Sequence, residues 1–242
     1  MTLDNKATGN FINIEENIKR VRGEIAELAV SLGRSPDEIR LVAASKTKPA
    51  ELVRRAIIAG ADAIGENRVQ EMLEKSEVGA YSGAPLHFIG HLQSNKVKNV
   101  VGLCDIIESV GSRELLTLIG DKAVAKGITQ DILIEVNIGR EPQKSGVMPE
   151  ETEEMLELAS KTSGIRVLGL MTVPPVGDKN EINERNCNYF DAIYKLYIDM
   201  RAKKYDNISM RFLSAGMSDS YPEAIRAGSN MVRIGSAIFG SR

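Results

Sequence analysis

The sequence predicts an α/β protein of the (β/α)8 TIM-type barrel class, with one extra helix at the N-terminal end. Three observations lead to this fold class. Eight short strand-like runs follow one another along the chain, helical patterns that often close on glycine separate them, and the length of 242 residues is near the roughly 250 residues of such barrels. We expect a single domain over residues 1–242, with residues 1–10 flexible. A doubly wound open sheet is the alternative architecture.

The first element is an amphipathic helix over residues 11–32. Apolar residues recur there at alternating spacings of three and four, and Gly33 follows as a helix stop. A coiled-coil seam is the alternative, but packing on the domain is favoured at this length. The chain stops at Arg242, directly after the last strand-like run, so we expect no helix there and predict that the first helix packs beside strands eight and one.

The strand-like runs are short, apolar and bounded by polar or turn residues, which is typical of strands covered on both faces. They lie at residues 40–46, 62–67, 86–92, 105–110, 131–137, 167–173, 212–217 and 231–238. Helical patterns occupy residues 49–59, 112–126, 149–162 and about 181–204. Ser220 opens a further helix with a capping box and a proline in its first turn.

Composition argues against several classes of protein. A net charge of −2 and a pI near 5.9 give no basic footprint for nucleic acid. Cys104 and Cys187 lie far apart, and with only His87 and His91 beside them they form no zinc-ligand set, so no metal site is expected. Without a leader or an apolar run of about 18 residues, the chain is expected to be cytoplasmic and to bind no membrane.

A lysine ends the first strand-like run. Lys46 follows the apolar residues 41–44 and Ser45, at the strand end where active sites of this fold lie. Two roles are open for it. The side chain could simply reach solvent along its apolar stem. Alternatively, it could be a Schiff-base lysine, desolvated so that its neutral amine attacks an aldehyde or ketone.

Small residues end the seventh and eighth strands, at residues 214–218 and 235–237. Loops after these two strands of a barrel frequently bind phosphate, because glycine lets backbone N–H groups come close and a following helix start adds a positive dipole. Ordinary turn chemistry would explain either run alone. Two such runs on these two strands favour phosphate binding.

Arg233 lies in the middle of the last strand-like run. A buried charge there must be paired, either with a carboxylate such as Glu66, Glu108 or Glu135 or with a ligand. A lysine for an aldehyde, a glycine–serine nest for a phosphate and an arginine for a ring nitrogen together fit one small molecule, pyridoxal 5′-phosphate.

Several longer motifs point to a family. They lie at residues 43–47, 65–67, 69–71, 87–90, 92–93, 95–96, 144–146, 169–172, 213–214, 216–218, 232–235 and 238–240. Through these segments the chain resembles the pyridoxal phosphate homeostasis proteins, a family also described as alanine racemase N-terminal domain-like, from about residue 11 to the C-terminus.

The resemblance implies pyridoxal phosphate as the cofactor and assigns roles to residues. Lys46 would carry the cofactor covalently, and Arg233 would face its pyridine nitrogen. Asn67 and Met171 would line the pocket. The phosphate would be held by the segments that contain Ser214, Gly216, Met217, Ser218, Gly235 and Ser236.

The chain departs from the usual family pattern at three positions. Arg68 stands where a tyrosine commonly follows Gly-Glu-Asn, which removes an aromatic side chain from that loop. Leu86 replaces a common tryptophan, and Ala215 a frequent methionine. The last two are interpreted as packing changes, although Ala215 could loosen the phosphate loop.

Other polar residues near the strand ends receive simpler roles. His87 and His91 are expected to pack or hydrogen-bond rather than to act in chemistry, because no nucleophile is paired with either. The loop at residues 137–146 either guards the pocket mouth or is an ordinary solvated loop. Lys48, Lys96 and Lys144 remain rivals to Lys46 as the reactive lysine.

Together these features predict a carrier rather than an enzyme. An arginine beside the pyridine nitrogen weakens the ring as an electron sink, and no second domain follows to supply an acid/base partner. We expect reversible carriage and buffering of pyridoxal phosphate, with delivery to apo-enzymes, by a monomer or weak dimer. An amino-acid racemase and a cofactor-free Schiff-base aldolase acting on a phosphosugar are the alternatives.

Overall fold

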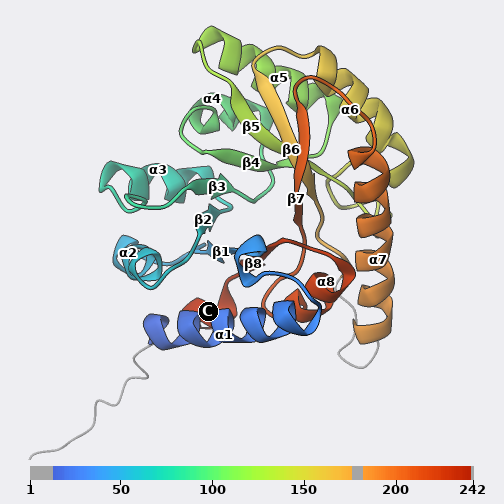
Figure 1. Ribbon diagram of the computed structural model, residues 1–242. Helices are drawn as coiled ribbons and strands as arrows, with labels where there is room; N and C mark the ends of the chain where they lie inside the picture. The colour runs from blue at the N-terminus through green and yellow to red at the C-terminus, as the bar shows by residue number, and fades with distance from the viewer. Residues whose placement is uncertain (1–12, 176–181, 241–242) are drawn as a thin grey trace, which may run out of the picture.

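The structure is a computed structural model that describes residues 13–175 and 182–240. Eight parallel strands form one closed barrel in chain order, and the last pairs with the first (Figure 1). The strands are β1 (Arg40–Ala44), β2 (Ala63–Glu66), β3 (Leu86–Phe88), β4 (Ile106–Val110), β5 (Gln130–Glu135), β6 (Ile165–Met171), β7 (Ile208–Ser214) and β8 (Met231–Ile234). The predicted (β/α)8 barrel is confirmed, and the open doubly wound sheet is wrong because the sheet closes.

Helices surround the barrel on its outer side (Figure 1). They are α1 (Ile14–Ser31), α2 (Ala50–Ile58), α3 (Val69–Glu77), α4 (Val97–Val100), α5 (Arg113–Ala125), α6 (Thr152–Lys161), α7 (Ile182–Arg201), α8 (Tyr221–Ala227) and α9 (Ser236–Phe239), with short 3-10 turns at Pro36–Glu38, Ser94–Lys96 and Pro149–Glu151. No helix in the described parts of the chain is long and apolar enough to cross a membrane.

Several boundaries differ from the sequence prediction. The strand-like run at residues 86–92 is a strand only over Leu86–Phe88, because its second half turns into the loop at the barrel mouth. The expectation of no helix after the last strand is wrong, since the single turn α9 follows β8. One turn is too short to show a periodic pattern. The expected helix starts near residues 11 and 181, the expected flexibility of residues 1–10 and the chain end at 242 lie outside the described residues.

The first helix lies beside strands eight and one, where the sequence placed it (Figure 1). Its immediate neighbours are α2 on one side and α8 and α9 on the other. Asn17 donates from Nδ2 to the carbonyl of Ile238 at 2.8 Å, which fixes α1 to α9. Its buried face packs in one apolar cluster with the outward side chains of Leu41 on β1 and Val232 on β8. That face consists of Ile14, Ile18, Val21, Ile25 and Ala29.

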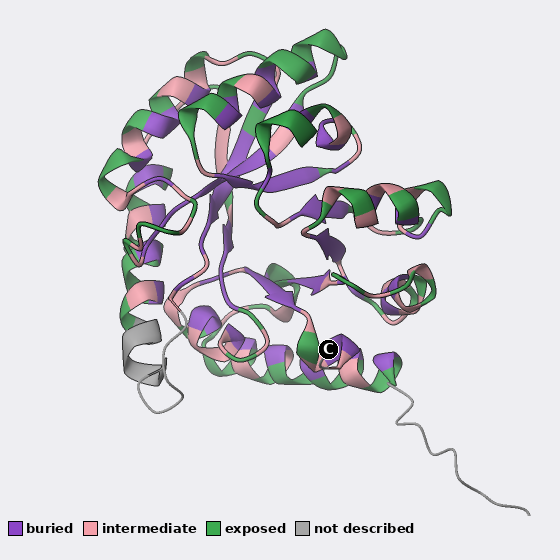
Figure 2. Cartoon of the chain, turned by 180° about the vertical axis from the view of Figure 1, so that it is seen from behind, coloured by how far each residue is buried: buried purple, intermediate pink, exposed green. Residues whose placement is uncertain are grey.

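The inside of the barrel has an apolar layer and a polar layer. Figure 2 shows that the strands are buried while the helices are exposed on their outer faces. Alternate strand residues point inward. The apolar layer contains Val42, Ala63, Ile106, Leu133, Leu168, Met171 and Met231. The polar layer lies toward the carboxyl ends of the strands and contains the buried side chains of His87, Glu108, Ser214 and Arg233.

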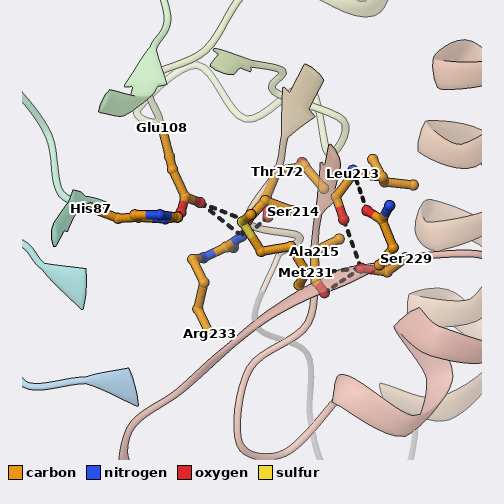
Figure 3. Close-up of polar contacts among 10 residues, drawn as sticks. His87, Glu108, Thr172, Leu213, Ser214, Ala215, Ser229, Met231 and Arg233 are labelled. Atoms are coloured by element: carbon orange, nitrogen blue, oxygen red, sulfur yellow. Dashed lines mark hydrogen bonds and ion pairs between the residues drawn. The ribbon is translucent and has the colours of Figure 1, made fainter. Parts of the chain in front are cut away.

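The barrel closes weakly between β7 and β8. Among the described residues of these two strands, the register holds the single pair Ser214 and Met231. Three backbone hydrogen bonds join the two segments, from Asn230, Ala215 and Arg233 N–H groups, and side chains add further contacts (Figure 3). The Oγ of Ser229 lies 2.8, 2.9 and 3.0 Å from the carbonyl oxygens of Leu213, Ala215 and Met231. Asn230 Oδ1 accepts from the N–H of Leu213 at 2.8 Å.

Candidate functional site

A pocket of about 470 Å³ opens at the carboxyl-terminal end of the barrel. Its described lining comes from the ends of β1, β2, β3, β6, β7 and β8 and the loops after them: Ala44, Lys46, Thr47, Lys48, Asn67, Ile89, Val173, Met217, Ser218, Asp219, Arg233, Gly235, Ser236 and Gly240. Most of the predicted site residues therefore meet in one place. Chain segments some 190 residues apart contribute, and barrel closure brings them together.

Lys46 stands two residues past the end of β1, on the side of the strand that faces the barrel interior. Ala44, on the same side, also lines the pocket. The sequence interpretation of a desolvated amine is not what the structure shows, because the Lys46 side chain is exposed. Lys46 lines the pocket and does not belong to the apolar layer inside the barrel. A lysine there is accessible to a ligand and to water.

The rival lysines differ from Lys46 in their contacts. Lys48 lines the same pocket, but its Nζ donates to the carbonyl of Phe239 at 2.9 Å. Lys144 forms an ion pair with Glu141 at 2.5 Å, and neither it nor the exposed Lys96 is among the described pocket residues. The geometry therefore favours Lys46 over all three.

Arg233 is the cation at the floor of the pocket (Figure 3). It is 4% exposed. Its Nη1 donates to Ser214 Oγ at 2.5 Å, its Nη2 donates to the carbonyl of Thr172 at 2.8 Å, and Glu108 Oε2 lies 3.9 Å away. Of the two roles that the sequence left open, the ion pair inside the barrel is present, and Arg233 also lines the pocket, where it could contact a ligand.

Glu108 is the carboxylate that neutralises this arginine. His87 Nδ1 lies 2.6 Å from Glu108 Oε1, and Ser214 Oγ lies 2.6 Å from Glu108 Oε2. Burial alone would raise the pKa of Glu108, but the hydrogen bond and charge of His87, with Arg233 and Ser214, lower it below its ordinary value. The expected hydrogen-bonding role of His87 is confirmed, whereas His91 is exposed.

The other two carboxylates proposed for Arg233 behave differently. Glu66 is fully buried, and its partner is Lys75 at 2.6 Å. Glu135 lies within electrostatic range of Arg233 and accepts from Ser145 Oγ at 3.1 Å. Burial raises the pKa of Glu135, and Ser145, Arg233 and His91 oppose this only in part.

The loops after β7 and β8 meet at Ser218. Its Oγ accepts from the N–H of Gly235 at 3.2 Å and from that of Ala237 at 3.3 Å. Gly216 has φ +97°, and a Cβ added there would lie 2.7 Å from the Cβ of Ala224. Only glycine fits such a position without displacement. The two small-residue runs therefore form one wall of the pocket, as the sequence suggested.

Three predicted site residues do not appear in the described lining of the pocket. Ser214 is fully buried beneath Arg233, and Met171 packs inside the apolar layer. Gly216 presents its carbonyl to the N–H of Arg233 at 3.0 Å. The periodicity of a strand identifies which residues point inward but not how deep they lie. The prediction therefore included residues that lie beneath the pocket as well as residues that line it.

The structure shows where the three residues that depart from the family pattern lie. Arg68 is exposed at the start of α3, with its Nη1 3.4 Å from Glu71 Oε1. Leu86 is buried in β3. Ala215 is buried against Phe190 and Ala224, so the chain is well packed at this point of the loop.

Some pocket residues escaped the sequence analysis. Thr47, Ile89, Val173 and Asp219 lie in loops and were not assigned to the site. Thr47 and Ile89 stand within the family motifs, and Ile89 and Val173 within strand-like runs, but the one signal for a role in the pocket was position after a strand end. The loop at residues 137–146 does not contribute to the described lining. No group of three or more metal-ligating side chains occurs within residues 13–175 and 182–240.

Comparison with known proteins places this geometry in a family. The family model "Alanine racemase, N-terminal domain" matches residues 13–242. The chain is 38% identical over 231 residues to the pyridoxal phosphate homeostasis protein of Aquifex aeolicus, covering 96% of this chain and 99% of that one. It is 37% identical over 234 residues to the Escherichia coli K12 protein of the same name, covering 95% and 97%.

Solved structures with a similar fold support the same family assignment. PipY of Synechococcus elongatus, solved without pyridoxal phosphate, superposes with a TM-score of 0.83 at 28% identity, covering 94% of this chain and all (100%) of that one. The same protein with pyridoxal phosphate bound gives 0.76 at 29% identity, covering 89% and 100%. An alanine racemase of Clostridium difficile, at 17% identity and a TM-score of 0.68, covers 94% of this chain and 57% of that one and shares the fold. The chain therefore belongs to the alanine racemase N-terminal domain family, among the proteins named pyridoxal phosphate homeostasis protein.

Proposed function

We propose that this chain binds pyridoxal 5′-phosphate in the pocket at the carboxyl-terminal mouth of the barrel and carries it reversibly on Lys46. The observation that carries the proposal is that Lys46, Arg233 and Ser218 line one pocket. An amine, a guanidinium and a hydroxyl–amide wall are the groups that an aldehyde, a ring nitrogen and a phosphate require. The names of the relatives and the ligand-bound PipY structure support this reading.

The residues present fit such a ligand. Asn67 lines the pocket, and its Oδ1 is buried without a hydrogen-bond partner. A buried polar atom of this kind usually has a partner that the protein alone does not supply. Gly235 also lines the pocket, and a Cβ built there would lie 3.2 Å from the carbonyl oxygen of Ala44, which is closer than an ordinary contact. A larger residue would therefore crowd this wall of the pocket.

The chemistry required of the protein is modest. Pyridoxal phosphate supplies an aldehyde that condenses with a lysine amine and releases one water, and addition of water reverses the reaction. Lys46 has to present its amine, and its exposed position lets water or another amine reach the same point. This exposure favours loading and unloading over long retention.

Arg233 supports a carrier rather than an enzyme. A guanidinium can donate but not accept hydrogen bonds, and Glu108 compensates its charge from below. An arginine facing the ring nitrogen therefore favours the unprotonated nitrogen, which makes the ring a weak electron sink for carbanion chemistry. The relatives are named as homeostasis proteins, which supports the same conclusion.

The test is to record the absorbance spectrum with and without pyridoxal phosphate, reduce with borohydride and map the modified peptide by mass. We expect one adduct, at Lys46. Lys96→Ala is the control, because Lys96 is exposed and lies away from the described lining. Adducts scattered over surface lysines would contradict the proposal. Trapping of a phosphosugar instead would favour the aldolase, and Lys46-dependent inversion of alanine would favour the racemase.

The wider role is part of the same proposal. The loaded protein would act in the cytoplasm, as a single domain and a monomer or weak dimer, and pass its ligand to apo-enzymes that need it. Incubating loaded protein with an apo-enzyme should restore that enzyme's activity in step with loss of the adduct. Sedimentation should show a mass near the 26.4 kDa of one chain. The control adds free pyridoxal phosphate at the concentration that the loaded protein releases at equilibrium. If the apo-enzyme regains activity no faster with loaded protein than in this control, direct delivery is contradicted.

A further inference from the structure

The Lys46 side chain is exposed, but hydrogen bonds hold the backbone on either side of it. On one side, the N–H of Ser45 donates to the carbonyl of Gly65 at 2.9 Å, and its Oγ donates to Glu66 Oε1 at 2.6 Å. The carbonyl of Ser45 accepts from Lys75 Nζ at 2.9 Å. Every polar group of the residue before Lys46 is therefore bonded within the protein.

On the other side the backbone adopts an unusual conformation. Thr47 has φ +62°, which is the left-handed region. A β-branched residue is rarely found there, and the conformation persists only where the surroundings impose it. The N–H of Thr47 donates to Glu71 Oε2 at 2.7 Å, so a carboxylate holds the strained residue in place.

These contacts converge from one helix. Glu71 and Lys75 stand four residues apart on α3, and therefore on the same face of it, and α3 packs beside β2. Lys75 is in turn held by Glu66, with side chains 9% and 0% exposed. We call Glu66, Glu71 and Lys75 the Lys46 clamp.

A buried ion pair is a poor way to gain stability, because burying the two charges costs about as much as their attraction returns. Its value lies in geometry, since each charged group has one low-energy arrangement. In the clamp, Lys75 and Glu66 together fix the Ser45 peptide, and Glu71 fixes the next turn. The residue whose two flanking peptides are held is the exposed lysine at the pocket mouth.

We infer that the Lys46 clamp positions Lys46 so that its amine meets an aldehyde held in the pocket. The inference rests on the proposed function, and it assigns Glu66, Glu71 and Lys75 as positioning residues that never touch the ligand. Without the clamp the strained turn at Thr47 relaxes, and the lysine stem leaves the pocket more often. Loss of the clamp should therefore affect covalent attachment more than non-covalent binding.

The experiment separates these two steps with two ligands. Covalent attachment is followed as the rate of borohydride-trapped adduct at Lys46 with pyridoxal phosphate. Non-covalent binding is measured by calorimetry with pyridoxine 5′-phosphate, which has an alcohol in place of the aldehyde. We expect Glu71→Ala to slow adduct formation on the order of tenfold, as a misplaced reacting group does, while the affinity for pyridoxine phosphate is unchanged.

Two further variants serve as rescue and control. Glu71→Gln keeps an oxygen that can accept from Thr47 and should restore the wild-type rate. Glu74→Ala, on the same helix, removes an exposed side chain that accepts a hydrogen bond from Gln70, and should behave as wild type. Equal rates of adduct formation in Glu71→Ala and wild type would overturn the inference. A fall in the affinity for pyridoxine phosphate as large as the fall in the adduct rate would also overturn it.

Thr47→Gly tests the strain without removing a charge. Glycine adopts positive φ freely, so this variant should unfold at the same temperature as wild type or higher. It should nevertheless form the adduct more slowly, because the turn is no longer rigid. An unchanged rate would contradict the clamp. If wild type itself gives no adduct at Lys46, the proposed function fails, and the inference fails with it.

Discussion

The two ends of the barrel interior treat their polar side chains in opposite ways. At the amino-terminal end a pocket of about 320 Å³ is lined by Asp62, Asp105 and Asp131. Asp62 and Asp105 each accept a backbone N–H from a neighbouring strand, at 2.6 and 2.7 Å. Asp131 pairs with Arg166 through two contacts of 2.7 Å. Each of the three carboxylates is used to fasten the barrel itself.

The carboxyl-terminal end leaves polar groups without protein partners. Asn67 Oδ1 and Glu135 Oε2 are buried and make no hydrogen bond within the described chain, and the Lys46 amine is exposed. Asn207 Oδ1, directly before β7 at the amino-terminal end, is also buried without a partner, but Asn207 does not line the pocket there. The carboxyl-terminal end differs because Asn67, with its unpartnered oxygen, and the exposed Lys46 line one pocket.

The sharpest test of the contrast removes the reactive amine. Lys46→Ala should abolish the trapped adduct, because the remaining pocket lysine, Lys48, is held against the carbonyl of Phe239. The free energy of unfolding should change by less than about 0.5 kcal/mol, because the side chain is exposed. Mass mapping and urea unfolding check the two parts. A full adduct on another pocket residue would break the comparison.

Removing the arginine should lower stability strongly. Arg233→Leu takes the guanidinium away from the buried Glu108 carboxylate, which keeps its contacts to His87 and Ser214, at an expected cost of up to about 3–5 kcal/mol in the free energy of unfolding. The double variant with Glu108→Gln should recover part of this loss, because the buried carboxylate is then absent. Urea unfolding of wild type and the two variants measures both changes in stability. A double variant less stable than Arg233→Leu would contradict the ion-pair account.

An amino-terminal carboxylate should matter for stability alone. Asp105→Ala leaves the buried N–H of Leu86 without an acceptor, at an expected cost of about 1–3 kcal/mol. Adduct formation at Lys46 should be unaffected at a temperature where the variant is folded. If adduct formation slowed while the fold remained intact, the two ends would be coupled and the comparison would need revision.

The smallest expected effect concerns Glu135 and pH. Burial raises its folded-state pKa above the unfolded value of about 4.3. The folded state therefore binds more protons in this window, and wild type loses this contribution as pH rises through the folded pKa. Glu135→Gln should gain stability relative to wild type from pH 4.5 upward, measured by urea unfolding at several pH values.

Glu108→Gln serves as the opposite case. The pKa of Glu108 is lowered, so its contribution is present above the unfolded pKa and is lost as pH falls through the folded pKa. This variant should therefore lose stability relative to wild type as pH rises. Identical pH trends for the two variants would show that the two carboxylates share one environment.

Much of the fold was predictable because its signals are local. Strand-length apolar runs, glycine helix stops and the alternation of the two indicate an α/β fold, and the chain length favours a barrel over the doubly wound sheet that remained the alternative. Boundaries at the barrel mouth were less accurate, since residues 89–92 are as apolar as the strand that precedes them yet form a loop. The segment that forms α3 contains one of the family motifs, but the sequence analysis did not predict it as a helix. Five of its nine residues are charged or glutamine, and its buried face is narrow, so no clear apolar periodicity marks it.

The site was predictable as a set of residue types but not as an arrangement. Lys46, Arg233 and the two small-residue runs follow from their places at strand ends. The sequence could not show which of the three glutamates pairs with Arg233. Whether a strand residue faces into or out of the barrel depends on where the alternation of each strand begins, and Glu66 faces outward to Lys75. The clamp was equally invisible, since it depends on a backbone angle at Thr47 that no residue preference suggests.

The gap in the hydrogen-bond ladder between β7 and β8 has a consequence for solubility. It leaves the first half of β7 as a strand edge within a closed barrel, and such edges can template the addition of another chain. Asn230 Nδ2 caps the carbonyl of Arg211 there at 2.7 Å. Lys203, Lys204 and Arg211 line the groove along this edge. Lys203 is paired with Glu153, and the Tyr197 hydroxyl donates to the Met210 carbonyl at 2.7 Å, so side-chain caps and charged residues both cover this edge.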